Sequence, residues 1–359
     1  MEAYKKRNLR MDVNMKILII HTCGLGDMIV FTPAFEVLSK MYPSAEFDVI
    51  TVQKFAEYPV MFRRNVKNIF TVPVKPVAIL KLATKLRKRK YDISIVTTVG
   101  TPWKGAFFSF LIGAKTKIGE IRSNFTGFFY TKSVLYEKKI HRAERALRLA
   151  RTIVPQNIHA PNYPTFPLKE EHYIEASKLL VNRDLSRFIC IGIHPGTAIN
   201  FLSRRWGKRN YSILINKISA KFPNVRSVIF GTQSEREEID YILQNSNAVY
   251  LGETPLEITA ALISKMKIFI SNDSGLGHIA SCFENIWNIS LFGPTDEAVA
   301  RPYGDKSIVV RSDVCRYAPC SDAYDKSVKN CGIVCMNELS VDKVFVQINN
   351  LLAPFTDRE

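Results

Sequence analysis

Short apolar runs alternate with amphipathic stretches along most of the chain. Each apolar run has the composition of a strand that is buried on both faces of a parallel sheet. In the first half the predicted strands are Lys16–His21, Phe47–Val52, Ile69–Val72, Ile93–Thr97 and Lys115–Ile118. The stretches Met28–Met41 and Val77–Arg89 between them predict helices. This alternation is typical of a doubly wound parallel sheet.

The alternation pauses at Ala160–Leu168 (APNYPTFPL), which predicts a linker between domains, and then restarts. The predicted strands of the second half are Phe188–Ile193, Arg226–Phe230, Val249–Leu251, Ile268–Ser271 and Trp287–Phe292. Its predicted helices are Tyr211–Phe222, Glu235–Gln244, Thr254–Ser264 and Leu276–Phe283. The third of these is expected to begin with a Thr-Pro cap.

The chain length also favours two domains, because 359 residues are too many for one compact core. We expect them to span residues 1–165 and 166–359, with residues 1–14 as a polar, basic, disordered extension. The second domain would include a Cys-rich segment at 315–335 and a C-terminal helix that packs back on the first. No apolar run is long enough to cross a bilayer, and the start lacks the apolar core of a signal peptide. We therefore expect a cytoplasmic protein.

The formal net charge of +17 indicates an acidic partner. Basic residues cluster at Lys81–Lys90, Lys138–Arg151 and Arg204–Arg209. Each cluster has the simpler interpretation of a solvated helix face. A nucleic-acid binder would also need exposed aromatic residues among the basic clusters or a known module, and the sequence shows neither. The charge is better explained by a phosphate-bearing small molecule or an anionic membrane face.

The turn after the first strand, His21-Thr-Cys-Gly-Leu-Gly-Asp27, is the first candidate for chemistry. Gly24 and Gly26 allow a tight turn and a close approach of a ligand. Asp27 either caps the following helix or serves as a general base. The turn is not a dinucleotide fingerprint, because Asp27 and Val30 replace the later glycines and the carboxylate would repel a pyrophosphate.

Two turns of the second half have the composition of nucleotide contacts. His194-Pro-Gly-Thr197 is followed by Ser203-Arg-Arg-Trp206, and a Gly turn with an Arg suits a phosphate. Gly231-Thr-Gln-Ser-Glu235 places Ser234 where it could cap a helix. Glu235 could accept hydrogen bonds from ribose hydroxyls or act only as a first-turn charge.

A further turn, Ser271-Asn-Asp-Ser-Gly-Leu-Gly-His278, joins a predicted strand directly to a helix. The first amides of that helix, near Ser274 and Gly275, can hold a diphosphate. His278 lies within the first turn and can face the same anion. Capping alone would explain Asp273 or Ser274, but it does not explain His278 together with the small residues. The turn Phe292–Asp296 (FGPTD) could line the same pocket.

These turns, in this order, resemble those of glycosyltransferase family 9, the ADP-heptose:lipopolysaccharide heptosyltransferases. The resemblance runs from Met15 to about residue 350. The matching segments are Gly24–Phe35 (GLGDMIVFTPAF), the isolated His141, His194–Thr197 (HPGT), Ser203–Trp206 (SRRW), Phe230–Glu235 (FGTQSE), Ser271–His278 (SNDSGLGH) and Phe292–Asp296 (FGPTD). The resemblance implies a GT-B fold: two Rossmann-like doubly wound parallel-sheet domains, facing across a cleft.

The resemblance also implies roles for single residues. Asp27 corresponds to the catalytic base, on an N-terminal domain that binds the acceptor. The donor contacts, on the C-terminal domain, are Thr197, Arg204, Glu235, Asp273, Ser274, Gly275 and His278. The acceptor contacts are Gly26, Trp103 and Arg122. One departure is Gly207, where the family usually has Pro.

The implied activity is an inverting transfer of a sugar, with heptose from ADP-heptose as the family default. Asp27 would take a proton from an acceptor hydroxyl, and the departing ADP would be stabilised without a divalent ion. The acceptor would be a lipopolysaccharide core or a related anionic glycan, reached by peripheral contact with the inner membrane. Two alternatives are a sugar-nucleotide epimerase on a GT-B scaffold and a basic nucleic-acid-binding protein.

The chain has seven cysteines. We expect Cys23, Cys190 and Cys282 to be reduced packing residues. The others, Cys315, Cys320, Cys331 and Cys335, crowd one segment. Clustered cysteines in a cytoplasmic protein suggest a structural Zn or Fe site, although the spacing is irregular for a zinc ribbon. Free thiols or an oxidisable pair are the alternatives.

Overall fold

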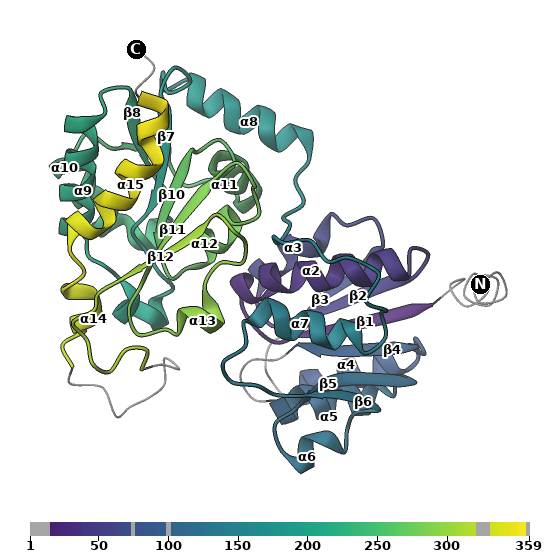
Figure 1. Ribbon diagram of the computed structural model, residues 1–359. Coiled ribbons are helices and arrows are strands. Elements are labelled where there is room, and N and C mark those ends of the chain that lie inside the picture. Colours follow the sequence, from purple (N-terminus) through teal and green to yellow (C-terminus); the bar gives the residue numbers. More distant parts are fainter. Residues whose placement is uncertain (1–14, 73–75, 98–101, 321–330, 357–359) are drawn as a thin grey trace. The chain divides into compact units, whose positions relative to one another are not determined.

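The computed structural model describes residues 15–72, 76–97, 102–320 and 331–356. Its contacts divide the chain into two compact units, Met1–Pro167 and Leu168–Glu359. Each unit contains one six-stranded parallel sheet flanked by helices (Figure 1). The extension at residues 1–14, which we expected to be disordered, lies outside the described residues.

The first unit follows the predicted strand–helix alternation. Its strands are β1 (Lys16–His21), β2 (Glu46–Thr51), β3 (Val66–Thr71), β4 (Ile93–Thr97), β5 (Thr116–Ile121) and β6 (Lys132–Leu135). Its helices are α2 (Leu25–Met41), the 3-10 helix η1 (Lys54–Glu57), α3 (Tyr58–Met61), α4 (Pro76–Arg87), α5 (Pro102–Ile112), α6 (Asn124–Gly127) and α7 (Arg142–Arg151). The strand order is β3-β2-β1-β4-β5-β6.

The central strand β1 shows why the apolar runs are continuous. Ile17 and Ile19 belong to a buried cluster with α2 and α7, whereas Leu18 and Ile20 belong to another with α4 and α5. Successive side chains of a strand point to opposite faces, so a strand covered on both faces needs an apolar residue at every position.

The second unit repeats this architecture. Its strands are β7 (Ile189–His194), β8 (Val225–Ile229), β9 (Val249–Tyr250), β10 (Ile268–Asn272), β11 (Trp287–Phe292) and β12 (Ser307–Arg311). Its helices are α8 (Glu170–Val181), η2 (Ile199–Arg204), α9 (Lys208–Lys221), η3 (Gln233–Glu235), α10 (Arg236–Asn245), α11 (Leu256–Ile263), α12 (Gly275–Ala280), α13 (Glu297–Ala300), α14 (Val334–Asn337) and α15 (Val341–Thr356). The strand order is β12-β11-β10-β7-β8-β9.

The two sheets share one topology. In each, the first and fourth strands of the unit are neighbours: β1 pairs with β4, and β7 pairs with β10. The chain leaves these two strands in opposite directions, which opens a crevice beyond their carboxyl ends. Ligands of doubly wound sheets bind at this point, so it is where candidate chemistry is sought in each unit.

The C-terminal helix α15 buries its apolar face within its own unit. Val344, Ile348 and Leu352 are fully buried in the core that includes Tyr211 of α9. Its apolar residues complete the second core, because α9 and α15 cover the same face of the sheet. The expectation that this helix also packs back on the first domain stays a prediction.

The Pro-rich stretch at 160–168 contains the division between the two units, and it lies against α2, since the Thr165 amide donates to the Thr32 hydroxyl at 2.8 Å. One local expectation needs correction. Helix α11 begins at Leu256 without a side-chain cap, and the Thr254 hydroxyl bonds Thr259 instead.

Within the described ranges, no helix is both long and apolar enough to cross a membrane.

Candidate active site

At the switch point of the first sheet, His21 ends β1 and Thr97 ends β4. The two side chains meet at 2.8 Å between Nδ1 and Oγ1, while Nε2 lies 3.3 Å from the Gly24 carbonyl oxygen. Burial lowers the pKa of His21, and the opposing effects of the Asp27 charge and the Gly24 carbonyl do not offset it. A neutral imidazole therefore ties the Gly-containing turn to the neighbouring strand.

Asp27 lies in the first turn of α2. The N-cap of that helix is Gly24, so the interpretation of Asp27 as a cap is wrong. The Asp27 carboxylate accepts a hydrogen bond of 2.7 Å from Arg142, at the start of α7. His141 caps α7 by accepting from the Ala143 amide, which fixes the point where Arg142 begins the helix.

The Asp27–Arg142 pair lines a small cavity, with His21 and Thr97 also in its wall. Two further charged residues, Glu120 and Arg145, complete the polar lining. They form a buried two-pronged ion pair in which Arg145 Nε lies 2.7 Å from Glu120 Oε1. The cavity therefore combines carboxylate and guanidinium groups with buried strand ends.

The predicted acceptor residues fall into two places. Gly26 is in the first turn of α2, next to Asp27. Trp103 and Arg122 lie together in a second hollow of the first unit, lined also by Ser123, Phe125 and Thr126. Arg122 connects this hollow to the charged cavity, because it lies 3.7 Å from Glu120.

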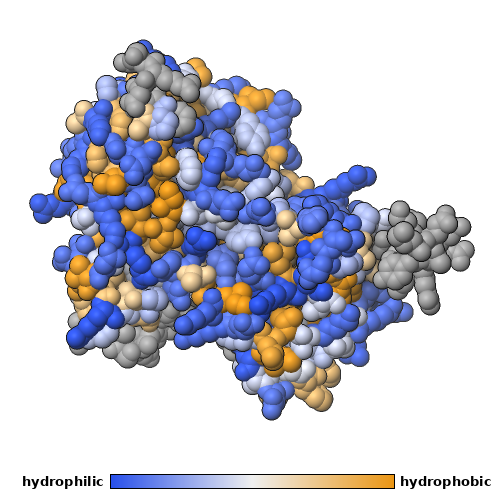
Figure 2. All heavy atoms as spheres, in the orientation of Figure 1, coloured by the Kyte–Doolittle hydropathy of each residue, from blue (hydrophilic) through white to orange (hydrophobic). Residues whose placement is uncertain are grey.

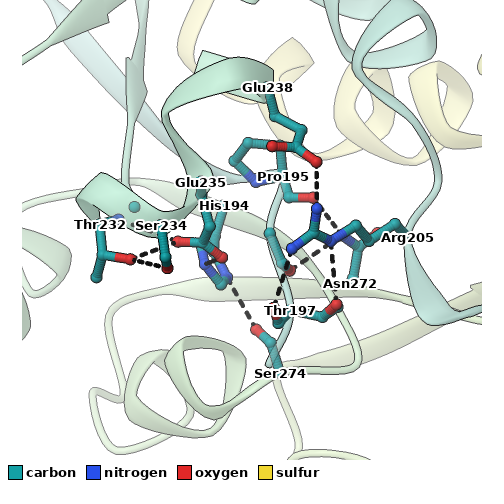
Figure 3. A network of polar contacts seen from close by, with 12 residues as sticks. His194, Pro195, Thr197, Arg205, Thr232, Ser234, Glu235, Glu238, Asn272 and Ser274 are labelled. Atoms are coloured by element: carbon teal, nitrogen blue, oxygen red, sulfur yellow. Dashed lines mark hydrogen bonds and ion pairs between the residues drawn. The ribbon is translucent and has the colours of Figure 1, made fainter. Parts of the chain in front are cut away.

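A polar network spans the switch point of the second sheet (Figure 3). His194, at the end of β7, contacts Ser274 Oγ at 3.0 Å through Nδ1 and Glu235 Oε1 at 3.2 Å through Nε2. A carboxylate can only accept, so Nε2 carries the hydrogen. The predicted donor residues Glu235 and Ser274 are thus joined through His194. The sequence had indicated His194 only as part of the His-Pro-Gly-Thr turn, without a role of its own.

Glu235 lies directly against Gly196 of the His-Pro-Gly-Thr turn. A Cβ atom built on Gly196 would overlap the Glu235 carboxylate, so any larger residue there would displace that side chain. Burial would raise the pKa of Glu235, but His194, the Thr232 amide and Arg205 outweigh it, and the pKa lies below its ordinary value. The Thr232 amide donates to Oε2 at 3.0 Å. Ser234 is not the cap expected for this turn, since Thr232 caps η3.

Arg204 and Arg205 have separate partners. Arg204 pairs with Asp273 at 2.8 Å and lies over the Phe201 ring at 4.1 Å. Arg205 pairs with Glu238 and donates to the Thr197 hydroxyl at 3.3 Å (Figure 3). The structure therefore brings the predicted donor residues Arg204 and Asp273 together, whereas the Thr197 side chain is occupied within its own loop.

Asn272 connects three of these loops, and sequence reasoning did not single it out. Its amide nitrogen donates to the Pro195 carbonyl at 2.7 Å, and its amide oxygen accepts from the Trp206 amide at 3.1 Å. The Tyr211 hydroxyl donates to the same oxygen at 3.0 Å. Asn272 is completely buried, so its side-chain amide must find hydrogen-bond partners within the protein. Its position directly after a predicted buried strand was the sequence signal that could have identified it.

Helix α12 is shorter than predicted, covering Gly275–Ala280. Ser274 is its N-cap residue but makes no side-chain cap bond, because its hydroxyl faces His194. A helix of this length has a weak dipole, so charged side chains such as Arg204 matter more for an anion than we had expected. His278 lies in α12 and is 8% exposed.

Comparison with known proteins decides the family. The model of glycosyltransferase family 9 (heptosyltransferase) matches residues 79–329, which is most of the chain. The chain belongs to glycosyltransferase family 9. The protein is therefore a glycosyltransferase, as the resemblance of its turns had implied.

Similar proteins extend along nearly the whole of this glycosyltransferase. The chain is 24% identical to lipopolysaccharide heptosyltransferase 1 of Pseudomonas aeruginosa, over 96% of this chain and 100% of that protein. Its fold is similar to that of a family 9 glycosyltransferase from Veillonella parvula, with a TM-score of 0.77 and 19% identity over 96% of this chain and 99% of the other. It is also similar to ADP-heptose lps heptosyltransferase II of E. coli, with a TM-score of 0.70 and 23% identity over 95% and 99% of the two chains. The predicted GT-B fold class is confirmed.

The four clustered cysteines of this glycosyltransferase gather near the Gly293-Pro294 turn. The Cys320 amide donates to the Pro294 carbonyl at 3.0 Å, and the Cys335 sulfur would be 3.0 Å from a Cβ on Gly293. Burial, reinforced by the other three cysteines, raises the pKa of the Cys335 thiol to about 11. No group of metal-ligating side chains was found within the described ranges, and residues 321–330 of this segment lie outside them. Cys23, Cys190 and Cys282 are buried thiols that are not joined in a disulfide.

Proposed function

We propose that this glycosyltransferase moves heptose from ADP-heptose onto a lipopolysaccharide core or a related anionic glycan. The observation that carries the proposal is the polar network at the carboxyl edge of the second sheet, where His194 joins Glu235 to Ser274 beside the Arg204–Asp273 pair. The names of the Pseudomonas and E. coli relatives support heptose and ADP as the transferred sugar and the nucleotide.

The C-terminal domain binds the donor. Glu235 accepts from the ribose hydroxyls, and Arg204 binds the diphosphate together with the amides at Ser274 and Gly275. Arg204 has five N–H groups, so it can contact a phosphate while it keeps its pairing with Asp273. His278 faces the sugar-diphosphate end of the donor, and Thr197 positions the loop that carries Arg205.

The N-terminal domain binds the acceptor, and Asp27 is the general base. As the acceptor hydroxyl attacks the anomeric carbon, Asp27 takes its proton and the bond to the diphosphate breaks, which inverts the anomeric centre. Arg142 holds the carboxylate in place at 2.7 Å. Gly26, Trp103 and Arg122 contact the acceptor glycan. Arg204 and His278 stabilise the leaving ADP, so the mechanism needs no divalent ion.

Calorimetric titration of the purified protein with a panel of nucleotide-sugars tests the donor assignment. We expect ADP-heptose and ADP to bind and UDP-glucose and GDP-mannose to bind at least about tenfold more weakly. Arg204→Ala should weaken ADP binding, while the exposed control Arg187→Ala should leave it unchanged. Equal binding of UDP-glucose and ADP-heptose would contradict the proposed donor.

Incubation with ADP-heptose in the absence of an acceptor separates transfer from epimerisation. The transferase leaves the configuration of the sugar unchanged and releases at most free heptose and ADP. An epimerised nucleotide-sugar would instead support the alternative of an epimerase on the same fold. A salt-sensitive, sequence-specific shift of DNA would revive the nucleic-acid alternative.

The proposal extends to the location of the enzyme and to its cysteines. The enzyme works on the cytoplasmic side, in peripheral contact with the inner membrane. A structural Zn or Fe bound by Cys315, Cys320, Cys331 and Cys335 has the clustering of these cysteines in the sequence as its support. Metal analysis of the purified protein tests it: about one metal per chain that is lost when the four are changed to Ser supports a site. Metal-free, folded protein assigns them as thiols.

A further inference from the structure

Helix α5 presents aromatic side chains to solvent. Trp103, Phe107 and Phe110 are spaced four and three residues apart, which places them on one face of the helix. They are 46%, 39% and 44% exposed. Phe108 and Ile112, on the other face, are buried in the core of the first unit. The fold therefore uses one face of α5 for packing and leaves the aromatic face uncovered.

Helix α6 enlarges this surface. Phe125 and Phe128 are 62% and 78% exposed, and both rings contact the buried Phe129, at 5.2 and 5.7 Å between centroids. Phe107 and Phe110 contact the same ring, at 5.8 and 5.6 Å. The exposed rings therefore form one cluster around Phe129. We name it the aromatic face; its members are Trp103, Phe107, Phe110, Phe125 and Phe128.

Two exposed basic residues lie beside the aromatic face: Lys104 of α5 itself and Arg87 of α4. Helix α4 packs along α5, and Arg87 donates to the Leu111 carbonyl at the end of α5. The sequences of α4, α5 and α6 contain no acidic residue. Their exposed cations are Lys81, Lys85, Arg87 and Lys104. Lys85 lies over the Phe70 ring of β3, so Arg87 and Lys104 are the two that adjoin α5. On the side of the protein seen in Figure 2, hydrophobic residues reach the surface among hydrophilic ones.

We propose that the aromatic face binds the surface of an anionic lipid bilayer. Aromatic rings insert at the boundary between headgroups and acyl chains, and neighbouring Lys and Arg side chains attract anionic headgroups. The inference rests on the proposed function in one respect: a lipid-anchored acceptor presents its glycan next to a bilayer. Trp103 and Phe125 also line the hollow with Arg122, so that glycan would enter at the rim of the aromatic face.

A second copy of the chain is a less suitable occupant. Two copies meeting through this surface would bring two sets of Lys and Arg side chains together with no acidic partner on the same helices. An anionic bilayer satisfies the apolar and the basic part of the surface at once. Self-association through the aromatic face is therefore an outcome that the experiment must detect.

Vesicle co-sedimentation of the full chain tests the proposal. The vesicles are phosphatidylcholine alone or phosphatidylcholine with phosphatidylglycerol. The variant Phe110→Ser/Phe128→Ser removes exposed rings outside the hollow. Its control is Ile174→Ser/Val181→Ser, which removes exposed apolar residues from α8. For charge, Arg87→Glu/Lys104→Glu is compared with Lys178→Glu/Lys265→Glu, which changes exposed lysines elsewhere.

We expect the wild type to bind vesicles that contain phosphatidylglycerol and to be released by salt. The aromatic variant and the charge variant should each bind at least about tenfold more weakly, and their two controls should bind as the wild type does. Unchanged vesicle binding by Phe110→Ser/Phe128→Ser overturns the proposal. Failure of the wild type to bind anionic vesicles overturns it as well. A change of oligomeric state in size exclusion without an effect on vesicles assigns the face to self-association.

A parallel titration with ADP, without lipid, keeps this inference separate from the proposed function. Phe110 and Phe128 belong to the first unit and to neither proposed binding site, so both aromatic and control variants should retain ADP binding. If the wild type does not bind ADP, the proposed donor is contradicted, but the vesicle result still tests the aromatic face independently. Thermal unfolding of each variant confirms that it is folded.

Discussion

The Nδ1 atom of His194 lies 3.0 Å from the Oγ atom of Ser274, across the junction of β7 and β10. The first unit has a matching pair, His21 and Thr97, across the junction of β1 and β4. Each unit thus places a histidine at the end of its first strand and bonds it to a hydroxyl at the end of the fourth strand (Thr97) or two residues beyond it (Ser274). In each case the pair lies at the switch point, where a doubly wound sheet binds its ligands.

The Asp27 carboxylate is the group on which the proposed chemistry depends. Replacing it in Asp27→Asn keeps the size of the side chain and removes the base, so kcat should fall at least about a hundredfold. Donor affinity, measured by titration with ADP, should stay within about twofold. The exposed Asp342→Asn is the matched control. Full transfer activity in Asp27→Asn would remove Asp27 from the mechanism.

The contact between Gly196 and Glu235 predicts a large effect from a single methyl group. In Gly196→Ala the new Cβ would occupy the place of the Glu235 carboxylate, which must then move away from His194. ADP-heptose affinity should fall by about tenfold or more, because hydrogen bonds to a charged group contribute roughly 1.5–3 kcal/mol. Gly127→Ala is a fair control, since its Cβ would meet only a flexible Ile121 methyl at 3.3 Å. Equal affinity in both variants would argue against this geometry.

The lowered pKa of His21 predicts a loss of stability in acid. Because its folded pKa lies below the ordinary 6.5, the neutral ring stabilises the fold fully above pH 6.5. That contribution is lost as the pH falls through the folded pKa. Urea unfolding between pH 8 and pH 5 should therefore show a steeper decline for the wild type than for His21→Asn.

His159→Asn, which changes an exposed histidine of the same unit, is the control for this titration. Its stability should follow that of the wild type at every pH. A decline in His21→Asn as steep as in the wild type would show that the acid sensitivity has another source.

The indole of Trp206 connects the Ser-Arg-Arg-Trp loop to the C-terminal part of the chain. Its Nε1–H donates to the Leu339 carbonyl at 2.7 Å, and the side chain is 2% exposed. Trp206→Phe leaves that carbonyl without its donor, which should lower the free energy of unfolding by about 1–3 kcal/mol. Trp103→Phe, at an exposed position, should change it by less than about 0.5 kcal/mol. Comparable small losses in the two variants would contradict the role of the Trp206 bond.

The alternation of apolar runs determined the fold class without help from the structure. Buried strands such as β1 need an apolar residue at every position, and the resulting apolar runs can be recognised in the sequence. Elements with weaker patterns were missed: β6 has only one partly buried apolar side chain, Val134, in its core contacts, and α5 is apolar around most of its circumference. Periodicity carries little information in such segments.

The sequence also determined which turns carry the candidate residues, because small and polar residues after a buried strand have no packing reason to be there. Only the tertiary structure decided which of them meet. His194, Glu235 and Ser274 are separated by dozens of residues and come together because β7, β8 and β10 are neighbours in the sheet. Strand order is set by the packing of all the helices on both faces, a sum over contacts distant in sequence that no local pattern contains.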